Sequence, residues 1–260
     1  MQVADLGTVR LHYSDEGNGA PVVFVNSLMT DFRMWDRLVA RLPAGYRIIR
    51  YDKRAHGLSS ALPPPYRMDE LVDDLARLLD HLGVRDAIIV GLSIGGLIAQ
   101  GLAVARPDLV RALCLSNTGA RIATAEVWEA RFAAVREGGL EAIVDATMER
   151  WFPPGFRSRP EASAWRTMFL RQTPDAFLGC GKAISETDFT ESTARLGVPV
   201  LGIGATHDGS TPAELLRATV ASVAGGRFHL IEGAGHLPCI DAPDEYARVL
   251  SAFFAEVSGG

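Results

Sequence analysis

Short runs of apolar residues alternate along the chain with longer segments whose apolar residues recur at helical spacing. After an alternating run at 8–13, continuous apolar runs lie at 22–25, 87–90 and 198–203, and mainly apolar runs lie at 46–51, 110–115 and 228–231. Continuous rather than alternating runs are typical of strands that are covered on both faces of a parallel sheet. Because helical patterns separate these runs, the order predicts an α/β fold.

The helical segments carry recognisable ends. An apolar stripe predicts an amphipathic helix that begins at Asp69 as its N-cap and ends at Gly83, built on Leu71, Val72, Leu75, Leu78, Leu79 and Leu82. Similar spacing predicts helices at 33–42, 94–106 and 241–257. A further helix is expected to start with Thr211 as its cap, Pro212 at the first helical position and Glu214 completing a capping box.

The strand–helix alternation stops at Asn117 and resumes with the strand expected at 198–203. The segment between them is helical in pattern and rich in aromatic residues. We therefore expect a core domain formed by 1–118 and 189–260. Residues 119–188 would form a helical insertion, the cap, over the carboxyl edge of the sheet.

Composition narrows the class of protein. With 260 residues, 48% hydrophobic and 22% charged, the chain can bury a sizeable core. Its net charge of −5 predicts neither a nucleic-acid nor an anionic-membrane partner. The uncharged stretch 87–105 is long enough for a membrane span, but its internal glycines favour a strand, a turn and a helix.

Three cysteines, far apart and without C-x-x-C spacing, argue against disulfides and against a cysteine metal site. The start of the chain lacks a basic and then apolar leader, so we expect a cytoplasmic protein. No H-E-x-x-H, P-loop or dinucleotide-binding glycine motif is present, and we expect no metal and no organic cofactor.

One pentapeptide carries the candidate chemistry. Gly91-Leu92-Ser93-Ile94-Gly95 is a G-x-S-x-G sequence between a predicted strand and a predicted helix. Such a turn strains the serine and exposes its hydroxyl, and small residues on either side let the backbones pass. The Ile94 N–H at the helix start could then bind an oxyanion.

A serine nucleophile needs a base and a group that orients the base, usually in the chain order serine, acid, histidine. Asp208 and His236 each follow a predicted strand in that order, and the carboxyl ends of parallel strands are where ligands bind. Glu232 and Asp241 are the competing acids. The sequence predicts a Ser93–His236–Asp208 triad.

Further motifs extend this pattern to a family resemblance over nearly the whole chain. They are Asn26-Ser27-Leu28-Met29-Thr30-Asp31 with Met34-Trp35-Asp36, Arg50-Tyr51-Asp52, Asn117-Thr118, Val135-Arg136-Glu137-Gly138-Gly139, Glu149-Arg150-Trp151-Phe152 and Thr206-His207-Asp208. With these the chain resembles the α/β-hydrolase superfamily and, within it, the 3-oxoadipate enol-lactonases of aromatic-compound degradation. The resemblance implies a mostly parallel eight-stranded sheet with helices on both faces. It also implies an oxyanion hole formed by the Leu28 and Ile94 amides.

The resemblance implies hydrolysis of 3-oxoadipate enol-lactone, in protocatechuate and catechol breakdown, through an acyl-enzyme. A carboxylesterase or a carbon–carbon bond hydrolase could use the same triad on another small acyl substrate, because the triad does not select the substrate. A non-catalytic ligand receptor on a hydrolase scaffold is the remaining alternative. The sequence leaves the oligomeric state open.

Two positions depart from the family pattern, and one helix suggests the substrate. Met29 and Ala55 stand where lactonases tend to have glycine, and Met29 would shape the pocket beside the oxyanion loop.

On a predicted helix at 126–136, Trp128 and Arg131 share one face. Arg131 could bind a free substrate carboxylate between Trp128 and Trp151, or it could instead reach a surface glutamate.

Overall fold

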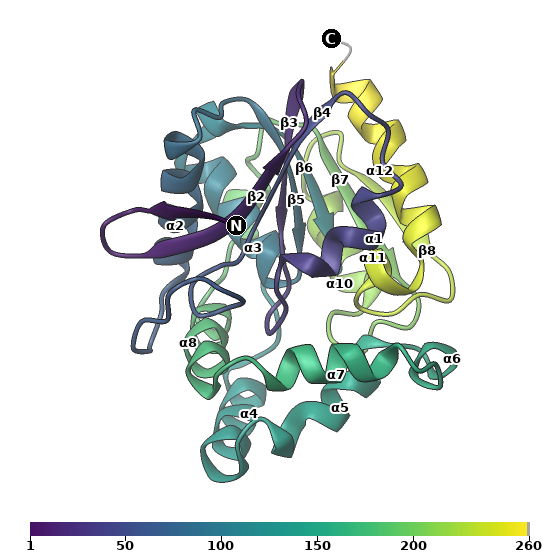
Figure 1. Ribbon diagram of the computed structural model, residues 1–260. Coiled ribbons are helices and arrows are strands. Elements are labelled where there is room, and N and C mark those ends of the chain that lie inside the picture. Colours follow the sequence, from purple (N-terminus) through teal and green to yellow (C-terminus); the bar gives the residue numbers. More distant parts are fainter. Residues whose placement is uncertain (259–260) are drawn as a thin grey trace.

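The computed structural model describes residues 1–258, which form one sheet covered by helices (Figure 1). Its eight strands are ordered β1-β2-β4-β3-β5-β6-β7-β8. In chain order, β1 to β8 span Gln2–Asp5, Arg10–Glu16, Ala20–Val25, Tyr46–Tyr51, Ala87–Leu92, Val110–Ser116, Val200–Ala205 and Arg227–Ile231. Strand β2 is antiparallel to both β1 and β4, and the other pairs are parallel. The predicted mostly parallel eight-stranded sheet is confirmed.

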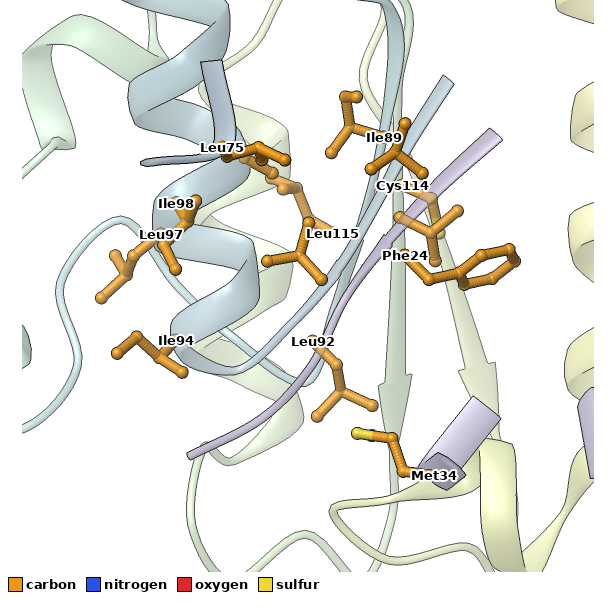
Figure 2. Close-up of a cluster of buried hydrophobic side chains, with 14 of the residues drawn as sticks. Phe24, Met34, Leu75, Ile89, Leu92, Ile94, Leu97, Ile98, Cys114 and Leu115 are labelled. Atoms are coloured by element: carbon orange, nitrogen blue, oxygen red, sulfur yellow. The ribbon is translucent and has the colours of Figure 1, made fainter. Parts of the chain in front are cut away.

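The central strand β5 is buried over its whole length and leads directly into helix α3 (Ile94–Ala105). Leu92 of β5 and Ile94, Leu97 and Ile98 of α3 are all buried in one hydrophobic cluster, and Figure 2 shows Leu92 beside Met34. The uncharged stretch 87–105 therefore divides between a strand and a helix. No helix within residues 1–258 has the length and apolar character needed to cross a membrane.

Helices cover both faces of the sheet. Helix α2 (Met68–His81) packs on α3, whereas α1 (Asp36–Val39) packs on α12 (Pro243–Ser258) at the other face (Figure 1). Helix α10 (Ala213–Ala221) lies against β7 and β8. The short elements are the 3₁₀ helices η1 and η2 and the helices α9 and α11, at Phe32–Trp35, Pro107–Leu109, Thr190–Thr193 and Pro238–Asp241.

Between β6 and β7 the chain leaves the sheet and forms six helices, of which the first five, α4 to α8, lie beyond one end of the sheet (Figure 1). Helices α4 to α8 span Ala125–Gly138, Glu141–Trp151, Pro154–Arg157, Ala162–Leu170 and Pro174–Ser185. They occupy the segment expected to be the cap. Its division from the core as a separate domain at 118/119 and 188/189 stays a prediction.

Some element ends differ from the sequence expectation. The helix expected at 33–42 is a 3₁₀ turn, η1, followed by the single-turn α1. Asp69 is not the N-cap of α2; Arg67 occupies that position, and the Glu70 carboxylate accepts a hydrogen bond from the Arg67 N–H at 2.8 Å. The helix expected at 241–257 begins at Pro243, after the separate turn α11.

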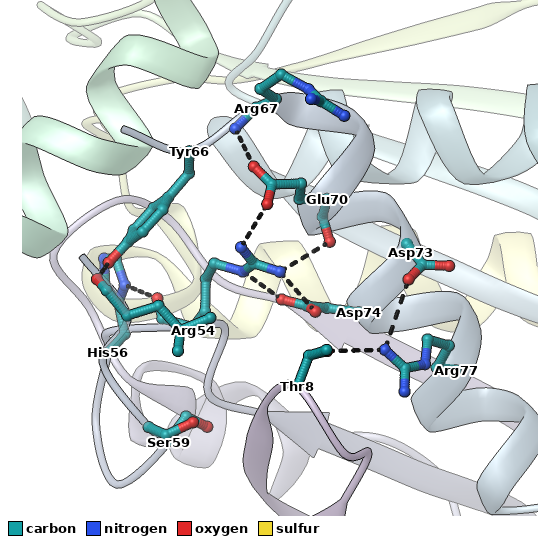
Figure 3. A network of polar contacts seen from close by, with 12 residues as sticks. Thr8, Arg54, His56, Ser59, Tyr66, Arg67, Glu70, Asp73, Asp74 and Arg77 are labelled. Atoms are coloured by element: carbon teal, nitrogen blue, oxygen red, sulfur yellow. Dashed lines mark hydrogen bonds and ion pairs between the residues drawn. The ribbon is translucent and has the colours of Figure 1, made fainter. Parts of the chain in front are cut away.

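A buried ion pair attaches the loop after β4 to helix α2. Arg54 Nε donates to Asp74 at 2.6 Å and its Nη2 donates to the same carboxylate at 2.9 Å (Figure 3). Both side chains are almost fully buried. The guanidinium also lies over the Tyr66 ring, 5.4 Å from its centroid. This loop also contains Lys53 and His56, which form hydrogen bonds with Ser27 and Met29 in the loop after β3.

Candidate active site

Ser93 stands at the junction of β5 and α3 in a strained conformation. Its φ of 59° and ψ of −120° lie where a residue with a Cβ is rarely found. Side chains at the flanking glycines would collide with backbone: a Cβ on Gly91 would meet Gly95, and one on Gly95 would meet Val25. The two glycines of the motif are therefore required by close backbone approach, as the sequence pattern predicted.

Asp208 follows β7 and is surrounded by donors. One carboxylate oxygen accepts the backbone N–H groups of Ser210 at 2.7 Å and Thr211 at 2.9 Å. The other accepts the Asn117 amide at 2.8 Å and lies 2.7 Å from the Thr211 hydroxyl. Burial would raise the pKa of Asp208, but the His236 charge and these hydrogen bonds outweigh it and lower the pKa. The carboxylate is held ionised and in one orientation.

His236 follows β8 and hydrogen-bonds to Asp208 through Nδ1, 2.9 Å from the nearer carboxylate oxygen. This contact places the hydrogen on Nδ1 and leaves Nε2 as the basic nitrogen. His236 and Ser93 line the same pocket. The two competing acids are placed elsewhere: Glu232 is exposed, and Asp241 accepts the Gly235 N–H at 2.8 Å.

Thr211 does not cap helix α10, although the sequence predicts that role. The first residue before α10 is Pro212, so the predicted Thr211 cap is wrong. The Thr211 hydroxyl instead lies 2.7 Å from both the Asn117 carbonyl and Asp208, and 3.3 Å from His236 Nδ1. It belongs to the support of the Asp208–His236 pair, a role that its helix-start pattern concealed.

The two candidate oxyanion donors are the backbone N–H groups of Leu28 and Ile94. Ile94 is the first residue of α3, and Leu28 lies in the loop after β3; Leu28 lines the pocket with Ser93. Within residues 1–258, neither N–H is engaged by a protein acceptor. The neighbouring Met29 N–H, by contrast, donates to His56 Nε2 at 3.0 Å.

All four predicted substrate-binding residues line this pocket: Met29 from the core, and Trp128, Arg131 and Trp151 from the cap. Phe169 and Phe177 complete an aromatic wall, with the Trp151 and Phe169 rings 5.7 Å apart edge to face. The cap side of the pocket therefore carries most of its aromatic surface. Met29 has a φ of 60° and Ala55 a φ of 62°, which explains why glycine suits both positions.

The pocket also contains two guanidinium groups. Arg131 lies over the Trp128 ring at 5.0 Å, and Arg150 donates to the Thr147 hydroxyl at 2.8 Å. Within residues 1–258, neither arginine forms an ion pair, so the alternative of a surface glutamate for Arg131 is wrong. Burial and the nearby Arg150 charge lower the pKa of Arg131 to about 10, and burial also lowers that of Arg150. Both stay cationic at neutral pH.

Arg150 was missed at the level of sequence. It lies in the Glu149-Arg150-Trp151 stretch, where the pattern does not show which of two adjacent side chains faces the pocket. Its i, i+3 spacing to Thr147 was the available signal.

The end of α5 is attached to both loops of the triad. The Arg150 carbonyl accepts the Gly209 N–H at 3.0 Å, and the Trp151 carbonyl accepts the His236 N–H at 2.8 Å. The residues that form the pocket wall are therefore fixed directly to those that hold the acid and the base. In the described part of the chain, no group of three or more His, Cys, Asp or Glu side chains could hold a metal ion.

Residues 22–249 match the model of the alpha/beta hydrolase family. The chain belongs to this family. Across its members, a serine at the strand–helix junction, an acid and a histidine can serve many acyl substrates. Membership of the family therefore does not select the substrate.

The relatives include several activities. 3-Oxoadipate enol-lactonase 2 of Acinetobacter baylyi is 34% identical, with 94% of this chain and 92% of that protein aligned. The enol-lactonase structure from Burkholderia xenovorans LB400 has a TM-score of 0.94 at 32% identity, covering 98% and 100% of the two chains. A non-heme chloroperoxidase of Kitasatospora aureofaciens is 28% identical over 88% of this chain and 89% of that protein. The resemblance to enol-lactonases is confirmed, and the family alone does not fix the reaction.

Proposed function

We propose that this hydrolase opens 3-oxoadipate enol-lactone to 3-oxoadipate, as a step of aromatic-compound breakdown. The proposal rests on Arg131 and Arg150, two arginines in the pocket that holds Ser93, which form no ion pair with the described residues 1–258. Both guanidinium groups are half-buried, where a cation without a counter-ion is unfavourable, and a bound carboxylate would compensate it with charge-assisted hydrogen bonds. The lactone of a dicarboxylic acid retains one free carboxylate, which matches this need.

The reaction would proceed in two halves. In the first, Ser93 Oγ attacks the lactone carbonyl while His236 Nε2 accepts the hydroxyl proton, and Asp208 stabilises the imidazolium. The Leu28 and Ile94 amides would bind the oxyanion, an interaction whose loss typically costs about 3–4 kcal/mol. Collapse of the tetrahedral intermediate breaks the ring C–O bond. The enol oxygen that leaves takes the proton from His236, and the enol becomes the ketone.

In the second half, water attacks the acyl-enzyme with His236 as the base. The acyl C–O bond to Ser93 breaks, the serine recovers its proton, and the open-chain oxo acid leaves. This sequence requires only the three side chains and the two amides.

The first test follows the ultraviolet absorbance of the enol-lactone, with a neutral aryl ester measured in parallel. We expect rapid loss of the lactone and slow ester turnover, and Ser93→Ala should abolish both. Fast ester cleavage with an inert lactone would leave a carboxylesterase, in line with the esterase from Thermogutta terrifontis that shares this fold at 28% identity.

A second test concerns the arginines. Arg131→Met and Arg150→Met should each raise the KM for the anionic lactone about 10- to 100-fold, as expected for a charge-assisted contact, and leave the neutral ester nearly unaffected. Arg136→Met is the matched control, because Arg136 lies on the same helix over Phe132 and outside the pocket. An unchanged lactone KM in both pocket variants would contradict carboxylate recognition.

A further inference from the structure

A buried lysine lies behind the candidate oxyanion loop. Lys53 follows β4 and is 2% exposed, and its Nζ donates to the Ser27 carbonyl at 2.5 Å. The chain has only one other lysine, Lys182, which is exposed and pairs with Glu186 at 2.8 Å. Since 24 of its 26 basic residues are arginine, a buried lysine is an unusual choice here.

The charge of Lys53 is not used in an ion pair within residues 1–258. The nearest acids are occupied: Asp52 contacts His12 Nδ1 at 2.8 Å and accepts the Phe32 N–H at 2.8 Å, and Asp31 pairs with Arg33 at 2.6 Å. The ammonium group is instead directed at a neutral peptide carbonyl. Placing a cation there has a desolvation cost, so its position calls for a physical reason.

The Ser27 carbonyl and the Leu28 N–H belong to the same peptide group. A donor on the carbonyl oxygen polarises the peptide and makes its N–H a stronger donor, an effect that a low dielectric enhances. The Thr30 hydroxyl also donates to this carbonyl, at 2.9 Å, and so fixes the plane of the peptide. Leu28 is the residue expected to bind the oxyanion.

The second candidate donor has the same kind of support. The Ser93 carbonyl and the Ile94 N–H share a peptide group, and the Thr118 hydroxyl donates to that carbonyl at 2.7 Å. Each peptide of the expected oxyanion hole therefore has a buried side-chain donor on its far side. Only the Leu28 peptide receives a full charge.

We propose that Lys53 is a positioning residue for hydrolysis, which polarises and orients the Ser27–Leu28 peptide so that the Leu28 N–H binds the tetrahedral oxyanion more strongly. The inference rests on the proposed function only in taking Leu28 as an oxyanion donor. It applies to ester and lactone substrates alike, because both pass through the same kind of intermediate.

The burial of Lys53 predicts that its contribution to kcat depends on pH. Burial lowers the pKa of Lys53 to about 8, against the opposing influence of Cys180 on α8 and of Asp52 and Asp31. His56 is the other titratable neighbour, and burial and the Lys53 charge hold its pKa well below the usual range, so it stays neutral. The Lys53 charge is present below pH 8 and lost above it. We therefore expect kcat to fall on the alkaline side of that value.

The test compares Lys53→Met with Lys182→Met, which removes the same charge at an exposed site. With a neutral aryl ester, Lys53→Met should lower kcat about 5- to 50-fold at pH 7, less than removal of a whole oxyanion donor, with KM nearly unchanged. Lys182→Met should match the wild type. The wild-type fall in kcat above pH 8 should be absent in Lys53→Met. A wild-type kcat in Lys53→Met, or the same alkaline fall in both proteins, would overturn the proposal.

Nuclear magnetic resonance keeps the test independent of whether the variant folds. Wild-type protein labelled with ¹³C in lysine should give two side-chain signals, of which one titrates near pH 8 with the same midpoint as kcat. A buried signal that titrates more than one pH unit from the midpoint of kcat would overturn the proposal. Failure of the proposed lactonase function looks different: the wild type would leave the lactone intact and cleave the ester, on which Lys53 is still measured.

Discussion

The backbone conformation of Ala55 is expected to lower the free energy of unfolding. Its φ of 62° is left-handed, a conformation that costs an L-residue about 1–2 kcal/mol. Glycine avoids this cost but loses about 0.5–1 kcal/mol more than alanine in backbone entropy on folding. We expect Ala55→Gly to raise the free energy of unfolding by about 0.5–1 kcal/mol, measured by urea denaturation. Ala76→Gly, in the ordinary helix α2, is the control and should lower it by a similar amount. A destabilised Ala55→Gly would contradict this interpretation.

Asp241 gives a second prediction, on pH and stability. Burial raises its pKa to about 7, so the folded chain binds this proton more tightly than the unfolded chain does. This group therefore lowers stability as the pH rises from about 4 to 7, by as much as about 4 kcal/mol. Asp241→Asn should be more stable than the wild type at pH 8 and equal to it near pH 4.

Urea midpoints at the two pH values would measure this difference. Asp244→Asn serves as the control, because that side chain is 85% exposed and its removal should change little at either pH. If Asp241→Asn and the wild type kept the same difference at pH 4 and 8, the carboxyl would not be the cause.

Sequence located the candidate catalytic residues better than the side chains that support them. Ser93, Asp208 and His236 follow strands at one sheet edge, and a one-dimensional pattern can show that. Thr211 and Arg150 act through contacts with residues far along the chain, such as Thr211 with Asn117, and no local pattern encodes them. Local spacing therefore shows which residues could react and leaves open which side chains hold them in place.

At the level of elements, the attachment of the β4–α2 loop is the most consequential contact outside the pocket. Asp74→Ala would leave the buried Arg54 with only its longer contact to the partly exposed Glu70, at 3.3 Å, and loss of a buried partner typically costs about 3–5 kcal/mol. We expect that loss in the free energy of unfolding, measured by urea denaturation. Asp73→Ala is the matched control on the same helix, because its pair with Arg77 is exposed and should be worth less than about 1 kcal/mol. Equal losses in the two variants would contradict the assignment.

The length of each element and the continuity of its buried face explain which elements the sequence did not predict. Strand β1 has four residues and only one of them is buried, so its pattern resembles a loop. The segment 33–42 has helical spacing but divides into η1 and α1 because its buried residues pack in two separate turns. Long elements with one continuous buried face, such as α2 and β5, were predicted nearly to their ends.

For the whole molecule, the cysteines offer a test of cooperative opening. Cys114 lies in β6, Cys180 in the cap helix α8 and Cys239 in α11, and all three are buried and free. Burial raises the pKa of each thiol, so none is a reactive thiolate in the folded chain. A disulfide reagent such as dithionitrobenzoate should label none of them in the native protein and all three in guanidinium. Selective labelling of Cys180 alone would instead show that the cap opens by itself.

The hydrogen bonds from the last turn of α5 to the Asp208 and His236 loops have a consequence for protein engineering. Arg150 and Trp151 contribute side chains to the pocket and accept hydrogen bonds from Gly209 and His236 through their carbonyls, so in the proposed enzyme substrate choice and catalytic geometry share one stretch of backbone. A cap transplanted from a relative would have to keep that turn in register. Side-chain exchange at Arg131, on a helix without such bonds to the triad loops, is the safer route to a new substrate.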